Sequence, residues 1–168
     1  VLAEVGPLVE IGAGGGLWAR RLAERDVDIV AYDTPNFDED YQDGGTVHTH
    51  ASKLTEVNWF DGMKRGDPSR ATEHADRALL LSWPDISGEG KYALTALQSY
   101  TGDTVVTIGE WHHQTFGDYA PGATVSGMSF SADFQAELEK TFDRRETVPL
   151  ANWPMFDAAL IHWKRKPA

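Results

Sequence analysis

The stretch Leu8-Val9-Glu10-Ile11-Gly12-Ala13-Gly14-Gly15-Gly16 decides the fold class. Its first four residues form a short apolar run, which is typical of a buried parallel strand, and the run ends in glycines. Residues 17–25 follow with apolar side chains at helical spacing and charged side chains between them. Residues 28–33 form a second apolar run that closes on an aspartate. Strand, glycine turn, helix and strand together predict a βαβ unit.

The rest of the chain continues this alternation. We expect a short third strand within residues 54–64, a buried strand at 78–83, a helix at 92–100, a strand at 104–108, a helix at 130–142, and strands at 146–150 and 156–163. The last two strands are expected to pair as an antiparallel ribbon. The sequence therefore predicts an α/β three-layer sandwich with a mostly parallel seven-stranded sheet, built as one domain over residues 1–168.

Composition excludes several classes of function. The 168 residues carry 26 acidic and 15 basic side chains, a formal net charge of −11, and the sequence has no cysteine. Nucleic-acid binding needs a basic face, so we expect no nucleic-acid partner. No apolar run is long enough to span a bilayer, so we expect no membrane partner. The lack of cysteine suits a cytoplasmic protein and removes thiolate chemistry.

The glycine loop predicts a nucleotide-like ligand at the start of a helix. Glycines let the backbone approach a ligand closely and present amide donors to it. A dinucleotide site of the form G-x-G-x-x-G would need glycine at position 17, where this sequence has leucine. A Walker loop fails because no Gly-Lys-Ser or Gly-Lys-Thr follows.

The spacing that fits is E-x-G-x-G-x-G, formed by Glu10 and the loop Gly12-Ala13-Gly14-Gly15-Gly16. With this motif the sequence resembles the class I S-adenosylmethionine-dependent methyltransferases. The resemblance implies that the loop, with Gly12, Ala13, Gly14 and Gly16, curls under the amino-acid end of S-adenosylmethionine and that Glu10 holds its ammonium. It also implies that Asp33 accepts hydrogen bonds from the ribose hydroxyls. Asp67 is the looser match to an aspartate near the adenine.

The segment Ser82-Trp83-Pro84-Asp85 leaves the fourth strand, where an open α/β sheet binds ligands. We assign Ser82 and Trp83 to the cofactor site, with a wall of the acceptor site or ordinary packing as alternative roles for Trp83. Many amine methyltransferases carry an Asp/Asn-Pro-Pro-aromatic motif at this point. Here the second proline is missing and the aromatic residue precedes the proline, so the motif does not support transfer to an amino group.

His112 and His113 follow the fifth strand and are the candidates for a general base toward a hydroxyl acceptor. A surface or structural histidine is the alternative for each. We expect no metal site, since adjacent histidines on an extended segment point to opposite sides and no third ligand accompanies them. Trp59 and Trp111 fall in predicted loops or strand ends, where they could line a pocket for an aromatic or polyketide-like acceptor.

The leading hypothesis is a methyltransferase that acts on a small molecule by in-line transfer. A second hypothesis keeps the fold and the cofactor but replaces methylation with another reaction, such as cyclisation or isomerisation. A third is a non-catalytic partner domain. The first strand begins within about eight residues of the start, whereas the resemblance implies preceding helices, so we expect that an N-terminal helical cap is missing. Homo-oligomerisation is left open.

Overall fold

The computed structural model describes residues 1–34, 60–85, 90–112, 129–152, 154 and 156–167. Within them the elements alternate along the chain as the sequence predicts. In order they are β1 (Leu8–Ile11), α1 (Leu17–Ala23), β2 (Ile29–Asp33), β3 (Met63–Arg65), the 3-10 helix η2 (Pro68–Glu73), β4 (Ala78–Ser82), α3 (Tyr92–Ser99), β5 (Thr104–Gly109), α4 (Ala132–Thr141), β6 (Phe142–Pro149) and β7 (Ala159–Arg165).

The seven strands form one sheet in the order β3-β2-β1-β4-β5-β7-β6. The first five strands in this order pair in parallel, while β7 pairs antiparallel with both β5 and β6. The predicted mostly parallel sheet with an antiparallel ribbon is therefore confirmed. The order reverses between β1 and β4, so the carboxyl ends of these two neighbouring strands open onto the switch point of the sheet.

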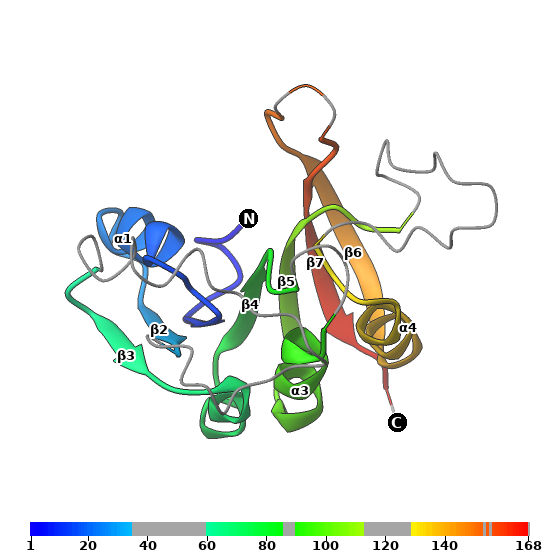
Figure 1. The fold of residues 1–168 in the computed structure, drawn as a ribbon, viewed down its shortest axis with the longest axis horizontal. Helices are drawn as coiled ribbons and strands as arrows, with labels where there is room; N and C mark the ends of the chain where they lie inside the picture. Colours follow the sequence, from blue (N-terminus) through cyan, green and yellow to red (C-terminus); the bar gives the residue numbers. More distant parts are fainter. Residues whose placement is uncertain (35–59, 86–89, 113–128, 153, 155, 168) are drawn as a thin grey trace.

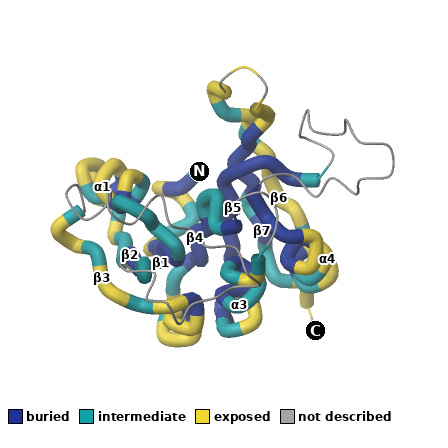
Figure 2. Tube along the Cα trace, viewed as in Figure 1, coloured by how far each residue is buried: buried dark blue, intermediate teal, exposed yellow. Residues whose placement is uncertain are grey.

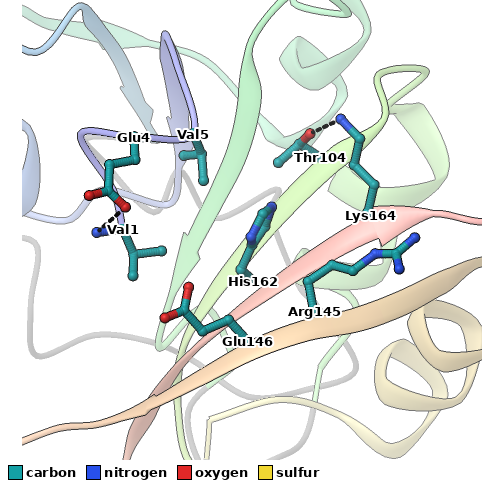
Figure 3. Close-up of a pocket in the computed structure, with 8 residues that line it drawn as sticks. All are labelled: Val1, Glu4, Val5, Thr104, Arg145, Glu146, His162 and Lys164. Atoms are coloured by element: carbon teal, nitrogen blue, oxygen red, sulfur yellow. Dashed lines mark hydrogen bonds and ion pairs between the residues drawn. The ribbon is translucent and has the colours of Figure 1, made fainter.

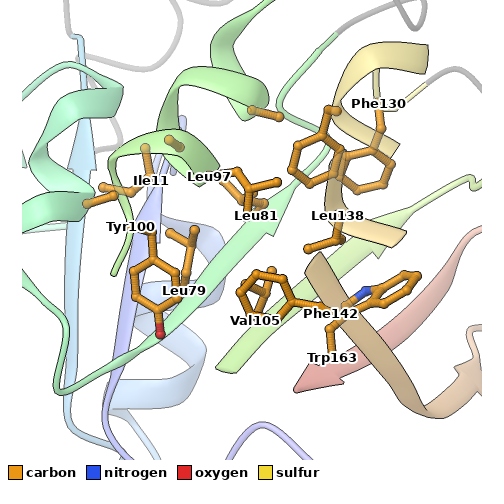
Figure 4. Packing of buried hydrophobic residues seen from close by; sticks show 14 of the residues in the cluster. Ile11, Leu79, Leu81, Leu97, Tyr100, Val105, Phe130, Leu138, Phe142 and Trp163 are labelled. Atoms are coloured by element: carbon orange, nitrogen blue, oxygen red, sulfur yellow. The ribbon is translucent and has the colours of Figure 1, made fainter. Parts of the chain in front are cut away.

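Helices cover the two faces of the sheet unequally (Figure 1). On one face, η2, α3 and α4 pack on a large core that includes Leu79, Val105 and Trp163 (Figure 4). On the other face, α1 packs on a smaller core with Leu80 and Ile108. Figure 2 shows the central strands buried and much of the outer strand β6 exposed. The side chains of the central parallel strands β1, β4 and β5 are thus enclosed on both sides, as their apolar sequences require.

Three elements differ from the sequence-based expectation. Strand β3 begins at Met63, at the end of the predicted interval, and has only three residues. The 3-10 helix Pro68–Glu73 was not predicted, because its sequence carries no apolar periodicity. Strand β6 starts at Phe142, directly at the end of α4, and contains a register shift between Arg144 and Glu146. This bulge obscures the alternation of side chains by which the start of the strand would be recognised.

Asp85 links the two helices that cover the larger core. Its carboxylate is buried, with Oδ1 accepting from the backbone N–H groups of Tyr92 (3.1 Å) and Ala93 (3.4 Å) at the start of α3. Its Oδ2 accepts from the backbone N–H of Ser131 (3.4 Å), the N-cap residue of α4. Both helix starts carry free amide donors and a partial positive charge, which a carboxylate satisfies.

We expect Asp85→Ala to lower the free energy of unfolding by about 3 kcal/mol, because three amide donors at the starts of α3 and α4, two of them in buried hydrogen bonds, lose their acceptor. Urea unfolding followed by circular dichroism measures this change. Asp76→Ala, which removes an exposed aspartate, is the control and should change stability by less than about 0.5 kcal/mol. Equal effects of the two substitutions would contradict this role of Asp85.

Candidate functional site

The glycine loop turns tightly between β1 and α1. The backbone φ angle is positive at Gly12 (79°), Gly14 (56°) and Gly16 (75°), a conformation that other residues rarely adopt. A Cβ at Gly12 would collide with the ring of Tyr92, and one at Gly16 would collide with Phe60. A Cβ at Gly14 would meet nothing within 4 Å. Protein atoms fill the space beside the outer two glycines, whereas the space beside Gly14 is left open.

Asp33 lies at the end of β2 and contacts this loop. Its Oδ2 accepts a hydrogen bond of 2.5 Å from the backbone N–H of Gly14. Burial raises the pKa of the Asp33 carboxyl to about 6, and the backbone N–H groups of Gly14 and Thr34 oppose this rise. The resemblance assigns Asp33 and the loop to one cofactor site, and in the structure the two are in contact.

Glu10 is the most deeply buried acid of the site. The residue is 1% exposed, and its Oε2 has no hydrogen-bond partner among the described residues. Burial raises the pKa of its carboxyl to about 8, with a backbone N–H bond from Ala19 opposing the rise and the charge of Asp33 adding to it. A buried carboxyl without a full set of partners is costly, so a ligand that supplies a donor would be favoured here.

Asp67 serves a structural role in the described chain. It is exposed and caps the 3-10 helix, with Oδ1 accepting from the backbone N–H (2.8 Å) and the hydroxyl (2.5 Å) of Ser69. The preceding residue, Gly66, donates its N–H to the carbonyl of Asp33. Asp67 therefore follows directly on the chain segment beside Asp33, and its contact with an adenine stays a prediction.

An apolar pocket of about 440 Å³ opens beside the carboxyl ends of β4 and β5. Its lining comes from α1, these two strand ends and the connection between β6 and β7. The lining residues are Trp18, Ser82, Trp83, Ile108, Leu150, Ala151, Asn152, Phe156 and Ala158.

Trp83 forms an aromatic corner of this pocket with Phe156. Their ring centroids lie 5.8 Å apart in an edge-to-face arrangement. Trp83 has a φ angle of +49°, which is uncommon for a bulky residue and is a form of backbone strain that clusters at functional sites. Ser82 accepts a hydrogen bond of 3.0 Å from the indole Nε1 of Trp18. The predicted pair Ser82 and Trp83 thus lies at the pocket.

The polar side chains at this pocket are largely engaged by the protein. Asn152 donates to the carbonyls of Leu150 and Ala158 and accepts from the N–H of Ala158, which closes the turn after β6. Asp85 follows the strand end but its carboxylate bonds to α3 and to Ser131, as described above. The pocket therefore presents mainly hydrocarbon and aromatic surface.

The sequence did not point to Trp18 or Phe156 as pocket residues. The spacing that marks the apolar face of α1 also marks Trp18 as an ordinary core residue, so no local signal separates the two roles. Phe156 is 40% exposed, and an exposed aromatic residue becomes informative only when its neighbours are known.

His112 and Trp111 do not line the pocket. Trp111 is 1% exposed and packs against Phe130 and Trp163, so the prediction that it forms a pocket wall is wrong. The Nε2 of His112 lies 2.8 Å from Oε1 of Glu139 on α4, on the sheet face opposite α1. This contact does not favour His112 as a base toward the pocket. His113 and Trp59 lie outside the described residues.

A second cavity, of about 350 Å³, lies where the first residues of the chain approach β5, β7 and β6 (Figure 3). It is lined by polar and charged groups that include Arg145, Glu146, His162 and Lys164. Thr104, the first residue of β5, also lines it, which places the cavity near the amino end of that strand. Ligands of open α/β sheets bind at the opposite ends, so this cavity does not complete the site.

Within residues 1–34, 60–85, 90–112 and 129–167, apart from the few undescribed positions near 153, no group of three or more metal-binding side chains comes together. No helix of the described chain is long and apolar enough to cross a membrane.

No protein-family model and no curated protein matches the sequence. Solved structures do match. A LepI variant in complex with SAH and a substrate analogue superimposes with a TM-score of 0.54 at 14% identity, over 97% of this chain and 43% of LepI. A structure described as a pericyclic reaction enzyme gives 0.52 at 14% identity, over 97% of this chain and 44% of that one.

A third match is the 1,6-didemethyltoxoflavin-N1-methyltransferase of Burkholderia thailandensis, with bound 1,6-didemethyltoxoflavin and S-adenosylhomocysteine. It gives a TM-score of 0.54 at 14% identity, over 96% of this chain and 72% of that protein. The chain spans less than half of the first two structures and most of the third. Strand order, glycine loop and these superpositions agree, and the chain has the fold of the class I S-adenosylmethionine-dependent methyltransferases.

Proposed function

We propose that this protein is an enzyme that binds S-adenosylmethionine and transfers its methyl group to a small, largely apolar acceptor. The observation that carries the proposal is the buried Glu10, whose Oε2 lacks a partner in the described chain. It lies at the end of β1, beside the glycine loop and close enough to Asp33 for the charges to interact. A carboxyl in this position needs a cationic or donor ligand.

The residues present fit the cofactor at three points. Glu10 offers its unpaired oxygen to the ammonium of the amino-acid end. The open space at Gly14 lets a ligand approach the backbone without meeting a side chain. Asp33, at the carboxyl end of the adjacent strand, offers a carboxylate to the two ribose hydroxyls, the role that an acid plays in dinucleotide folds. In the free protein the N–H of Gly14 holds this carboxylate in place.

The apolar pocket is our candidate for the acceptor site. It borders the end of β4 at Ser82, next to the switch point where the cofactor would lie. Trp18, Trp83 and Phe156 supply flat aromatic walls, which suit a planar apolar molecule. A volume of about 440 Å³ accommodates a small molecule rather than a polymer.

When bound, S-adenosylmethionine supplies an electrophilic methyl group on a sulfonium sulfur. The chain's part is to hold the acceptor in line and to keep water away, which alone can contribute much of the rate. No histidine is among the described residues that line the pocket. An acceptor whose nucleophile is already ionised, or is reactive when neutral, therefore suits this site best. The cytoplasmic location and the oligomeric state stay predictions.

A reaction other than methylation is the second candidate function. One structural neighbour is described as a pericyclic reaction enzyme, and the aromatic pocket without a described base also suits a rearrangement. Incubation with methyl-labelled S-adenosylmethionine and small-molecule extracts separates the two. Label in the product supports methyl transfer, whereas unlabelled product formed only with the cofactor present supports the alternative. A protein that binds no cofactor would fit the non-catalytic partner domain.

We expect Asp33→Ala to weaken binding of S-adenosylhomocysteine by at least about 30-fold, because hydrogen bonds to a charged group contribute about 1.5–3 kcal/mol. Titration calorimetry at pH 8 measures the affinity. Asp28→Asn, beside the amino end of β2, is the control and should stay within about twofold of the wild type. Unchanged affinity in Asp33→Ala would refute the proposed cofactor pose.

We expect the affinity for S-adenosylhomocysteine to rise between pH 6.5 and pH 8 and to level off above. The free Glu10 carboxyl, with its pKa near 8, is mostly protonated at pH 7, and an ammonium ligand favours the ionised form. Binding should then release up to one proton, with at most about a tenfold gain per pH unit. Calorimetry in buffers of different ionisation enthalpy counts this proton. Glu10→Gln should bind more weakly at pH 8, with a flatter profile.

The same pKa predicts how the free protein responds to pH. Since burial raises the Glu10 pKa above its usual 4.5, this group's stabilising contribution is complete below pH 4.5 and is lost as pH rises through about 8. The melting temperature of the wild type should therefore fall relative to that of Glu10→Gln as pH rises from 6 to 8.5. Parallel melting curves for the two proteins would show that Glu10 does not titrate in this range.

A further inference from the structure

Glu110 is a second buried glutamate at the carboxyl edge of the sheet, and the proposed methyl transfer does not use it. It follows β5 directly and is 0% exposed. Its Oε1 accepts a hydrogen bond of 3.0 Å from the backbone N–H of Asp157. Its Oε2 is buried and, within the described part of the chain, has no hydrogen-bond partner. Only Glu10 shares this combination among the carboxylates described.

The strand register places Glu110 on the pocket side of the sheet. Ile108 pairs with Leu160 and Gly109 with Ala159, where the printed pairing of β5 with β7 ends, and Glu110 is the next residue after this last pair. Side chains alternate along a strand, which puts Glu110 on the same face as Ile108. Ile108 and Ala158 both line the apolar pocket. Trp111, the next residue, belongs to the core on the opposite face, as this alternation requires.

The hydrogen bond to Asp157 strengthens this placement. Asp157 lies between Phe156 and Ala158, two residues that line the pocket. The Glu110 carboxyl is therefore enclosed behind the wall that these residues form. Phe156, at 40% exposure, is the least enclosed part of that wall, and its ring contacts Trp83 at the aromatic corner.

A purely structural role does not account for a glutamate here. The bond from the N–H of Asp157 uses only Oε1, so it does not account for the burial of Oε2. Burying a carboxyl with an unsatisfied oxygen costs free energy that such a role does not return. At Glu10 the same pattern coincides with the predicted ammonium site. At Glu110 it calls for a donor arriving from the pocket.

We propose that Glu110 is the polar recognition residue of the acceptor pocket. Its Oε2 accepts a hydrogen bond from a hydroxyl or amine of an otherwise apolar acceptor, while Oε1 stays bonded to Asp157. This inference rests on the proposed function, and it narrows the acceptor to a molecule with an apolar, planar body and at least one hydrogen-bond donor. The aromatic walls select the body, and the carboxylate selects the donor.

Two probes with the same ring system, of which only one has a hydrogen-bond donor, test this selection. 2-Naphthol and 2-methoxynaphthalene share one ring system, but only the first carries a hydroxyl. Ligand-observed NMR titration of the full chain, saturated with S-adenosylhomocysteine, gives the affinity for each. We expect the wild type to bind 2-naphthol about five to ten times more tightly, the effect of one hydrogen bond to a buried acceptor. A wild type with no preference would overturn the proposal without any variant.

Glu110→Gln keeps an acceptor for Asp157 and places an amide donor where Oε2 was. We expect it to lose the preference for 2-naphthol and to favour 2-methoxynaphthalene, whose ether oxygen accepts. Glu146→Gln, at an exposed position on β6, is the matched control and should keep the wild-type ratio. An unchanged ratio in Glu110→Gln would refute the role of Glu110.

The affinity for S-adenosylhomocysteine, measured on the same samples, separates the two levels of the proposal. If Glu110→Gln binds S-adenosylhomocysteine tightly and keeps the wild-type ratio of probe affinities, the proposed cofactor site is supported and the role of Glu110 in acceptor binding is refuted. Failure to bind S-adenosylhomocysteine would refute the proposed function itself. Trp83→Ala should weaken both probes to a similar extent, because it removes an aromatic wall that both ring systems would contact and leaves Glu110 unchanged. Equal affinities in Trp83→Ala and wild type would overturn the pocket assignment and the inference with it.

Discussion

The reversal of strand order between β1 and β4 is the constraint on which the site depends. Both strands are buried and parallel, so their chains must leave the sheet at the same edge, one toward α1 and the other toward α3. In the described chain, the segments that follow β1 and β4 diverge to opposite faces of the sheet, since α1 and α3 pack on different cores. Such a divergence leaves a crevice for ligands at the strand ends of open α/β sheets. The glycine loop starts at this edge, with its Gly14 N–H bonded to Asp33, and Glu10 is buried one residue before β1 ends.

The unequal covering of the two faces decides where further chemistry can occur. On the face of α3 and α4, Asp85 bonds to the starts of both helices, and Trp111 packs in the larger core. The residues that follow β4 and β5 lie on two sides of the sheet. Asp85, Trp111 and His112 contact the larger core or α4. Trp83 lines the pocket, and Glu110 bonds to Asp157 beside it. Residues packed in the larger core and residues on the pocket side therefore lie within a few positions of each other along the chain.

This arrangement on two sides of the sheet explains which parts of the fold and of the site could be predicted from the sequence. The βαβ unit and the mostly parallel sheet with its antiparallel ribbon follow from local signals, namely apolar runs separated by glycines and helical spacing. Asp85 and His112 could not be placed in this way, because their partners lie on α3 and α4, whose docking is a tertiary property. Asp67 was placed by resemblance alone, and in the described chain its nearest partner is Ser69, two residues away.

Glu110 illustrates a different limit. In the sequence it is one acid beside an aromatic residue and two histidines, and the histidines carry the more familiar chemistry. Only the folded structure shows that Glu110 is fully buried and that one of its carboxyl oxygens has no partner in the described chain. Two buried acids then stand at the same sheet edge, each with one oxygen unpaired in the described chain. Because a buried carboxyl with an unpaired oxygen is costly, we infer that each of the two is completed by a ligand. In the proposed scheme the cofactor supplies the partner of Glu10 and the acceptor supplies the partner of Glu110, so both carboxyls would be fully hydrogen-bonded only in the ternary complex.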